Sequence, residues 1–474
     1  MADGPSSSSG RIALLMQRIV GDRADVPTSL NDLRGSETAK AVGLAAAMIA
    51  NNVIALGSTV VFSRLLKDNQ GGGYGSLAAL VSYFLILSVV GQAMQVATAR
   101  EGVLGHLGVG AELMVTVRRW TRGLLLFTLA LTVVSVLLRD PIAHALNVKH
   151  DPWAAAIGLP AAGLWLELSV LRGVLQGVGD YKGVGLSLIG EQGSRLVCGA
   201  ILAAAGLGVT GAYLGTPLSF IAMGLYCGYR LRQHVREVEG EAVPTVTPAR
   251  VAAPSLWEHV KRAWAPIAGL VVIAILQNID IIAAKNRFDT HTASSYSAVA
   301  VAAKVLIWVA MGAGFYLVPE VSRRRAQGHD PRPILARALG IVAVCAVPVL
   351  LIFAVASHLL IKAAFGASKT TAADSLVVLG LAFSVLACTY LAVQYMLALR
   401  RTWFLVPLGA VAIAEPILLL NASHEPKSFA AVVLAIQIIG AAVAFTCALW
   451  PDRRRVSPPG PAEPVAEERV PEPV

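Results

Sequence analysis

A small set of ionisable side chains interrupts segments that are otherwise apolar enough to lie in a lipid bilayer. The stretch GEQGSRL places Glu191 and Arg195 one helical turn apart, and Glu167, Arg172, Asp280, Lys304 and Glu415 lie in similar surroundings. An ionised side chain at mid-bilayer costs about 2.5–3.5 kcal/mol on insertion scales, so such residues usually face a partner or a water-filled cavity. These residue types could therefore form ion pairs or bind a charged ligand inside the membrane.

The depths of four of these residues predict two pairs between neighbouring helices. Two apolar segments meet at the turn GVGDYKG, and residues equally far from that turn lie at one level. Glu167 and Arg195 are each about 15 Å from the turn at a rise of about 1.5 Å per residue, and Arg172 and Glu191 are nearer to it. We therefore expect the pairs Glu167–Arg195 and Arg172–Glu191, with Glu191 and Arg195 also in contact along their helix. Such a cluster could clamp the hairpin or line a substrate cavity.

Two further positions stand in the second half of the chain. Lys304 lies in the apolar run AVAVAAKVLIWVAMGAG, where Asp280 is its obvious neighbour. Lys304 could bind an anion in a cavity or form a structural pair with Asp280. Glu415 precedes Pro416, whose ring and missing N–H should bend the helix.

The composition explains why these charges are unusual. The chain is 56% hydrophobic and only 14% charged, whereas a soluble domain has about 25% charged residues. Apolar runs of about 20 residues, enough to cross a bilayer as helices, recur throughout. We expect an all-α, polytopic membrane protein with about twelve spans: residues 40–65, 76–99, 120–138, 153–177, 184–207, 209–229, 263–284, 293–319, 334–356, 372–398, 403–420 and 429–450.

Basic residues in the loops predict the orientation. With the N-terminus inside, about 27 Lys and Arg residues face the cytoplasm and about 9 face outward. Both termini are therefore expected to be cytoplasmic, and the net charge of +10 requires no nucleic-acid partner. The five cysteines are widely spaced and give no metal or disulfide pattern. We expect no metal site and no cofactor.

A polar stretch in the middle divides the spans into two sets of six. We expect a cytoplasmic tail at residues 1–39, a six-helix lobe at 40–230, a linker at 231–262, a second six-helix lobe at 263–450 and a disordered tail at 451–474. Similar landmarks recur in both lobes: a basic residue, a tyrosine about ten positions later, and a basic exit residue after one further helix. An even number of spans in each lobe predicts parallel repeats with a binding cavity between them.

Several motifs resemble those of polysaccharide flippases, a branch of the multidrug/oligosaccharidyl-lipid/polysaccharide (MOP) exporter superfamily that also holds the multidrug and toxin extrusion (MATE) transporters. They are Tyr74-Gly75 followed by a helix ending at Arg100, then LRGVLQGVGDYKGVGLSLIGEQGSRL, QNIDIIAAKNRF and VPEVSRRR. The resemblance implies two helical bundles that alternate between inward- and outward-open forms and carry a polyprenyl-diphosphate-linked glycan across the bacterial inner membrane. It implies substrate-binding roles for Lys304 and Arg195, and for Arg64 at the outer rim.

Other functions remain open at this point. An ion-coupled multidrug antiporter would need an anionic cavity, but the first span carries Asn51 and Asn52 and no acid. A membrane enzyme would need a sizeable loop with clustered carboxylates, which the short outer loops lack. A non-transporting scaffold for an export complex is the third alternative. As partners of a flippase we expect the lipid-linked glycan, membrane lipids and glycan polymerase or export proteins.

Overall fold

The computed structural model describes residues 37–66, 73–108, 110–240, 261 and 264–450. Most of the expected N-terminal tail, the expected C-terminal tail and most of the expected linker lie outside these residues. The described part of the chain contains helices, turns and bends, and no strand. It confirms the all-α fold class.

The helices follow one another with short connections. The first half contains α3 (Glu37–Leu65), α4 (Tyr74–Val103), α5 (Ala111–Leu137), α6 (Arg139–Ala145), α7 (Pro152–Ala156), α8 (Gly158–Gly177), α9 (Tyr181–Leu202), the π-helical turn η1 (Ala203–Leu207) and α10 (Gly208–Gly240). The second half contains α12 (Trp264–Arg287), α13 (Thr290–Ala303), α14 (Val305–Ala326), α15 (Arg332–Phe365), the 3₁₀ segment η2 (Ala367–Ser375), α16 (Leu376–Ala398), α17 (Leu405–Leu420) and α18 (Pro426–Leu449).

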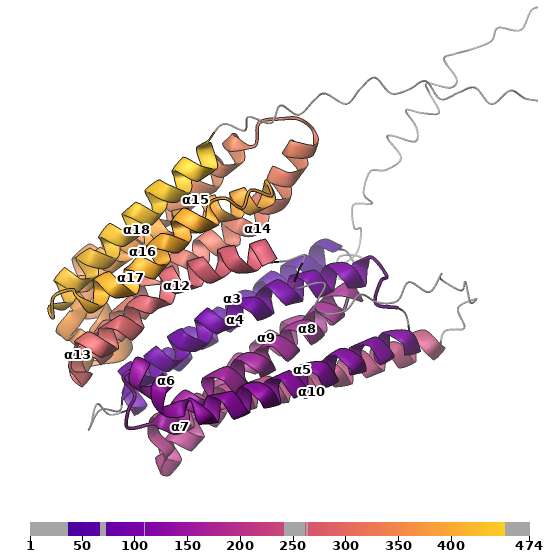
Figure 1. The fold of residues 1–474 in the computed structure, drawn as a ribbon, viewed down its shortest axis with the longest axis horizontal. Coiled ribbons are helices and arrows are strands. Elements are labelled where there is room, and N and C mark those ends of the chain that lie inside the picture. Colours follow the sequence, from indigo (N-terminus) through magenta and orange to yellow (C-terminus); the bar gives the residue numbers. More distant parts are fainter. Residues whose placement is uncertain (1–36, 67–72, 109, 241–260, 262–263, 451–474) are drawn as a thin grey trace, which may run out of the picture.

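The helices form two groups that lie side by side (Figure 1). Helices α3 to α10 pack mainly on one another, as do α12 to α18, and α4 packs against both α12 and α13. We call the end of the molecule where α10 ends and α12 begins the linker end, and the opposite end, where α4 and α13 begin, the far end. The long axes of the two groups diverge from the far end toward the linker end (Figure 1).

The predicted spans correspond to the helices observed. Ten segments of the described chain are long and apolar enough to cross a membrane, and Leu405–Leu420 is a shorter apolar helix. One segment, Tyr181–Glu237, has 57 residues and covers two predicted spans. Its chain turns back at Gly206 and Gly208, whose φ angles of 99° and 51° favour glycine. The predicted break at this very short turn is therefore present.

Some predicted boundaries are wrong. Helix α10 continues to Gly240, so the first ten residues of the expected linker are helical. The predicted span 293–319 is present as one candidate span, Thr290–Gly314, with a one-residue turn at Lys304 between α13 and α14. A short additional helix, α6, follows α5. Apolarity marks the part of a helix that lies in lipid, so polar extensions and interior breaks leave no hydropathy signal.

Two aspartates fix the starts of helices outside the apolar core. Asp180 Oδ1 accepts a hydrogen bond from the Gly183 N–H at 2.9 Å, and its Oδ2 lies 2.9 Å from Nη2 of Arg230 on α10. Asp289 accepts hydrogen bonds from the N–H groups of His291 and Thr292 at the start of α13. Hydrogen bonds from Thr292 hold the pKa of the Asp289 carboxyl below its ordinary value. Both residues are N-caps, which satisfy backbone donors that have no partner within the helix.

Glycine permits the close approach of α9 and α10. A Cβ atom at Gly215 would lie 2.6 Å from the Arg195 carbonyl oxygen and 2.8 Å from Cα of Gly199. Backbone atoms cannot move aside as a flexible side chain can. The two helices therefore touch through their main chains, as small residues allow in membrane bundles.

We predict that Gly215→Val destabilises the protein by about 1–3 kcal/mol, because the larger side chain must push α9 away from α10. Thermal unfolding of the detergent-solubilised chain measures the effect. Gly224→Val is the matched control on the same helix, since a Cβ there meets no atom within 4 Å. Equal melting temperatures for the two variants would contradict the described helix contact.

Candidate functional site

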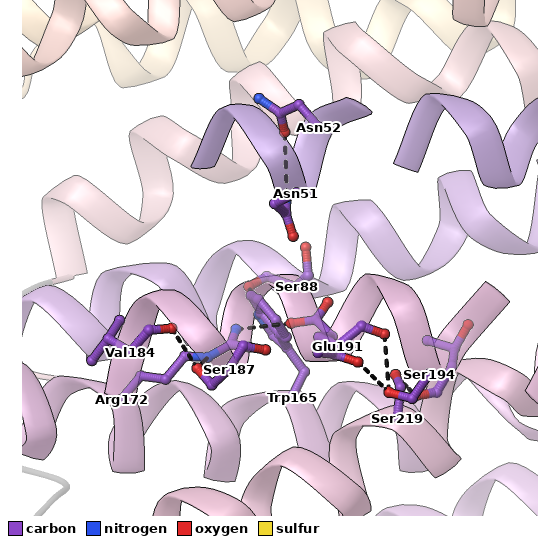
Figure 2. Close-up of polar contacts among 12 residues, drawn as sticks. Asn51, Asn52, Ser88, Trp165, Arg172, Val184, Ser187, Glu191, Ser194 and Ser219 are labelled. Atoms are coloured by element: carbon purple, nitrogen blue, oxygen red, sulfur yellow. Dashed lines mark hydrogen bonds and ion pairs between the residues drawn. The ribbon is translucent and has the colours of Figure 1, made fainter. Parts of the chain in front are cut away.

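Arg172 is the centre of a buried polar cluster in the first half, which we call the Arg172 cluster (Figure 2). Its side chain, fully buried on α8, points across to α9. There Nε donates to Ser187 Oγ and Nη2 to the Ser187 carbonyl, both at 2.8 Å, while Nη1 lies 2.8 Å from Glu191 Oε2. The guanidinium carbon also lies 5.6 Å from the centre of the Trp165 ring. The predicted pair Arg172–Glu191 is confirmed, and its geometry is that of a clamp between two helices.

The second predicted pair in this hairpin is wrong. Glu167 and Arg195 are both half-buried, yet within the described chain neither forms an ion pair with the other. The groups that interact electrostatically with Arg195 are Glu191, Tyr213 and Tyr74. Counting residues from the turn gives the depth of a side chain but leaves its direction around the helix undetermined. Glu167 and Arg195 share a level without sharing a face.

Arg195 lies beside the clamp, because Glu191, which pairs with Arg172, also attracts it. Its guanidinium has no hydrogen-bond or ion-pair partner among the residues that the structure describes. Tyr74 and Tyr213, both buried, flank it, and the Tyr213 hydroxyl also lacks a hydrogen-bond partner in the described chain. Two polar groups thus lie together in an apolar lobe with their hydrogen-bonding capacity unused. Such groups are costly to bury unless water or a ligand satisfies them.

Helix α3 carries two polar side chains that lie above the Arg172 cluster in the view of Figure 2. Asn51 and Asn52, both half-buried, share a hydrogen bond of 3.3 Å between their side chains. Asn51 is directed toward the segment of α4 that carries Ser88 (Figure 2). The Ser88 carbonyl accepts a hydrogen bond of 2.7 Å from Trp165 Nε1. Helices α3 and α4 therefore place uncharged polar groups near the Arg172 cluster.

The second half contains its own buried pair. Lys304 Nζ donates to Asp280 Oδ1 at 3.1 Å, and Tyr296 OH lies 3.4 Å from Asp280 Oδ2. Lys304 is 7% exposed, and its ammonium lies 5.2 Å from the centre of the Phe383 ring. Lys304 sits at the break between α13 and α14, where its carbonyl accepts from the Ile307 N–H three residues on. Of the two roles predicted for Lys304, this conformation contains the pair with Asp280.

Glu415 adds a second carboxyl group to this region. It is fully buried on α17 and interacts electrostatically with Asp280 and Lys304. Gln437 of α18 donates to Glu415 Oε1 at 3.1 Å and to the Leu276 carbonyl of α12 at 2.9 Å. Glu415 Oε2 and Gln437 Oε1 have no hydrogen-bond partner within the described residues. The structure places Glu415 with Asp280 and Lys304, in a lobe separate from Arg172 and Glu191.

Arg64 occupies neither cluster. It lies exposed in the last turn of α3 at the far end, where Nη2 donates to the carbonyl oxygens of Ala363 and Ala364 at 2.6 and 3.0 Å. These carbonyls end α15, which belongs to the other half of the molecule. Arg64 therefore joins the two halves in this conformation, and its expected role at a substrate rim stays a prediction.

Sequence reasoning missed several residues of these sites. Ser187 accepts a hydrogen bond from Arg172, while Tyr296 donates to Asp280 and Gln437 donates to Glu415. A lone glutamine within the strongly apolar segment 426–449 was a usable signal, because a buried amide requires partners. Serine gave no signal, since it can satisfy its hydroxyl on its own helix. Within the described residues, no group of three His, Cys, Asp or Glu side chains could hold a metal ion.

We predict that the pair Arg172–Glu191 is strongly coupled. Arg172→Met and Glu191→Leu should each destabilise the protein by about 3–5 kcal/mol, because each leaves its partner as an unpaired buried charge. The double variant should lose much less than the sum of the two. Thermal or denaturant unfolding of all four proteins in detergent provides the comparison. Additive losses would show that the two side chains do not depend on each other.

Comparisons with known proteins address the fold. Neither family models nor curated protein sequences match this chain. Solved structures do match: an inward-facing multidrug resistance MATE family transporter of the MOP superfamily has 14% identity and a TM-score of 0.64 over 84% of this chain and 93% of its own. The lipid II flippase MurJ in an inward closed conformation has 14% identity and a TM-score of 0.64 over 85% of this chain and 86% of its own. A MATE protein in the bent conformation has 15% identity and a TM-score of 0.58, with coverage of 88% and 95%. The chain has the fold that these MOP transporters share.

Proposed function

We propose that the protein is a transporter that moves a polyprenyl-diphosphate-linked oligosaccharide or polysaccharide precursor across a bacterial inner membrane by alternating access. In this proposal it is a multi-pass membrane protein without enzymatic activity. Its partners are the lipid-linked glycan, membrane lipids and glycan polymerase or export proteins. The shared fold supports a transporter, since MATE and MurJ proteins are named for transport, and it supports an antiporter equally well.

The unpaired guanidinium of Arg195 is the observation that favours an anionic cargo. Moving a diphosphate through the bilayer requires fixed positive charge to replace its hydration. The other buried cations of the two clusters already have acidic partners: Arg172 has Glu191, and Lys304 has Asp280. Arg195 is half-buried and forms no ion pair within the described chain, although Glu191, already paired with Arg172, attracts it. Its five N–H donors could bind phosphate oxygens in a bidentate manner.

Lys304 is the second cation that we assign to the headgroup. Substrate sites of such transporters commonly lie near the bilayer midplane, and Lys304 lies within the candidate membrane span Thr290–Gly314. Asp280 neutralises it in this conformation. A diphosphate could take the place of Asp280 only if that carboxyl moved away or gained a proton. In this proposal Lys304 therefore contacts the headgroup in another state of the cycle.

The alternative is an ion-coupled antiporter for cationic drugs. Glu167 favours it, because this acid is half-buried and, within the described chain, has no ion pair. Glu415 also supports it, as a buried carboxyl of which one oxygen has no hydrogen-bond partner among the described residues. An antiporter would use such acids to bind a cation and release it when the coupling ion binds. The two functions differ in the residue whose loss stops transport, namely Arg195 or Glu167.

We predict that Arg195→Gln slows transport of a diphosphate-linked glycan by about tenfold or more, since a hydrogen bond to a charged group contributes about 1.5–3 kcal/mol. The measurement uses the purified full chain in lipid vesicles that contain a fluorescent polyprenyl-diphosphate oligosaccharide. The lipid-linked glycans that accumulate when the gene is deleted identify the sugar to use.

Arg119→Gln is the control, because it removes the same charge from an exposed position on α5. Normal transport by Arg195→Gln would defeat the assignment of Arg195. Failure of the unmodified protein to move the glycan, with ion-driven efflux of a cationic dye that Glu167→Gln abolishes, would establish the antiporter instead.

We predict that the double variant Lys304→Met/Asp280→Asn folds normally yet transports the glycan at least about tenfold more slowly. The double change leaves neither member of this pair as an unpaired ion, and asparagine can still accept the Tyr296 hydrogen bond, so we expect stability to be preserved. Thermal unfolding checks the first part and the vesicle assay checks the second. Unchanged transport by a stable double variant would make the pair purely structural.

A further inference from the structure

Hydrogen bonds join the two halves of the molecule at the far end. Arg64 of α3 donates to the last carbonyls of α15, at 2.6 and 3.0 Å. The Gly75 N–H of α4 donates to Ser294 Oγ of α13 at 3.0 Å. Asn147, which follows α6, donates to the Lys285 carbonyl at 2.7 Å, and Asn286 donates to the Ala145 carbonyl at 3.0 Å. All these residues stand where helices begin or end, at the end opposite the linker.

The contact between Gly75 and Ser294 brings the main chains of the two halves close together. A Cβ atom at Gly75 would lie 3.1 Å from the backbone nitrogen of Ser294 and 3.3 Å from the carbonyl carbon of Ala293. The first seven residues of α4, from Tyr74 to Leu80, are buried, as are the residues of α13 from Ala293 to Ala300. Two helices from different halves thus pack closely at this point. A larger side chain at Gly75 would have to separate them.

Arg64 acts on the end of a helix in the other half. The last carbonyl groups of a helix have no N–H partner within it and carry partial negative charge. A guanidinium that donates to them satisfies those acceptors and is attracted by the helix dipole. The side chain of Arg64 crosses between the halves to do so. If the far ends of α3 and α15 separated, both groups would return to water or lipid headgroups.

The two asparagines form a reciprocal pair with the opposing backbone. Asn147 has a φ angle of 53°, a left-handed conformation that asparagine tolerates better than most residues. This conformation belongs to the connection between α6 and α7, from which its amide reaches α12. Asn286 reaches in the opposite direction and also caps the Ile282 carbonyl of its own helix at 3.0 Å. Each half therefore donates to a carbonyl of the other.

We propose that these contacts form a gate that closes the far end, and that Arg64 and the Gly75–Ser294 contact set the balance between the conformation described and one open at that end. The gate rests on the proposed function only in that a transporter must open alternately at both ends. Arg64 is then a conformational latch: its donors are engaged by α15 whenever the far end is closed. The latch predicts a change in conformation on mutation even when no cargo is present.

The test measures conformation directly. Spin labels are attached to cysteines that replace exposed residues, in a background lacking the five native cysteines. One pair of labels, at Arg236 and Gln327, reports the linker end, and the other, at Lys149 and Ser423, reports the far end. Pulsed EPR distances are recorded for the full chain in lipid nanodiscs without cargo. We expect Arg64→Ala to raise the ratio of far-end-open to far-end-closed molecules by at least about tenfold. A change of this size corresponds to the loss of one charge-assisted hydrogen bond.

Gly75→Val should shift the same ratio in the same direction without changing a charge, because it wedges α4 from α13. Arg139→Ala is the control for Arg64: Arg139 is also a far-end arginine, but its contacts are with Asp140 and Trp153 of its own half. Gly123→Val is the control for Gly75, since a Cβ there meets nothing within 4 Å. The inference is overturned if Arg64→Ala and Gly75→Val leave both distance distributions unchanged.

A cross-link separates the gate from the transport function. Oxidation of the Gly75→Cys/Ser294→Cys variant should hold the far end closed, fix the linker-end distance and stop transport reversibly, with recovery on reduction. If Arg64→Ala slowed glycan transport while both distances stayed as in the unmodified protein, Arg64 would be a ligand for the substrate, and the latch would be refuted. If Arg64→Ala shifted the EPR distances but neither the unmodified protein nor any variant transported the glycan, the latch would be supported and the proposed cargo would be refuted.

Discussion

The fold depends on keeping ionised side chains inside apolar helices without leaving them as isolated charges. Arg172 meets this constraint with Glu191 and Ser187, and Lys304 meets it with Asp280. Each pair crosses from one helix to another, so the electrostatic requirement also fixes how neighbouring helices are placed. Breaking either pair would leave an unpaired buried charge, a strongly destabilising change. The clamp in the α8–α9 hairpin is thus a cause of the packing around it. Arg195 is half-buried and forms no ion pair within the part of the chain that the structure describes, an exception that calls for a functional reason.

The two halves share a plan but distribute their charges differently. A basic residue ends the first helix of each half, Arg64 in α3 and Lys285 in α12. A buried tyrosine near the start of the next helix stands close to a cation in both halves: Tyr74 interacts with Arg195, and Tyr296 reaches Lys304 through Asp280. Among the described residues Arg195 forms no ion pair, although Glu191 attracts it, whereas Lys304 pairs with Asp280.

Much of this architecture is predictable from the sequence, because lipid imposes a simple requirement on each span. The spans, the turn at Gly206 and the pair Arg172–Glu191 followed from hydropathy, glycine and depth. The pair Glu167–Arg195 did not form, since depth leaves the rotation of each helix unspecified. The break at Lys304 and the contact of Gly75 with Ser294 depend on tertiary packing, for which an apolar run carries no local signal. The substrate roles of Arg195 and Lys304 remain predictions, because binding of a substrate is tested by a transport experiment.

The far-end contacts constrain residue identity on the donor side more than on the acceptor side. Arg64, Asn147 and Asn286 donate through side chains, but what they meet are main-chain oxygens of Ala363, Ala364, Lys285 and Ala145. A carbonyl oxygen is present whatever residue carries it. Drift among homologues could therefore alter the accepting positions freely while the donors stayed under selection, so a survey of co-varying residue pairs would overlook this interface.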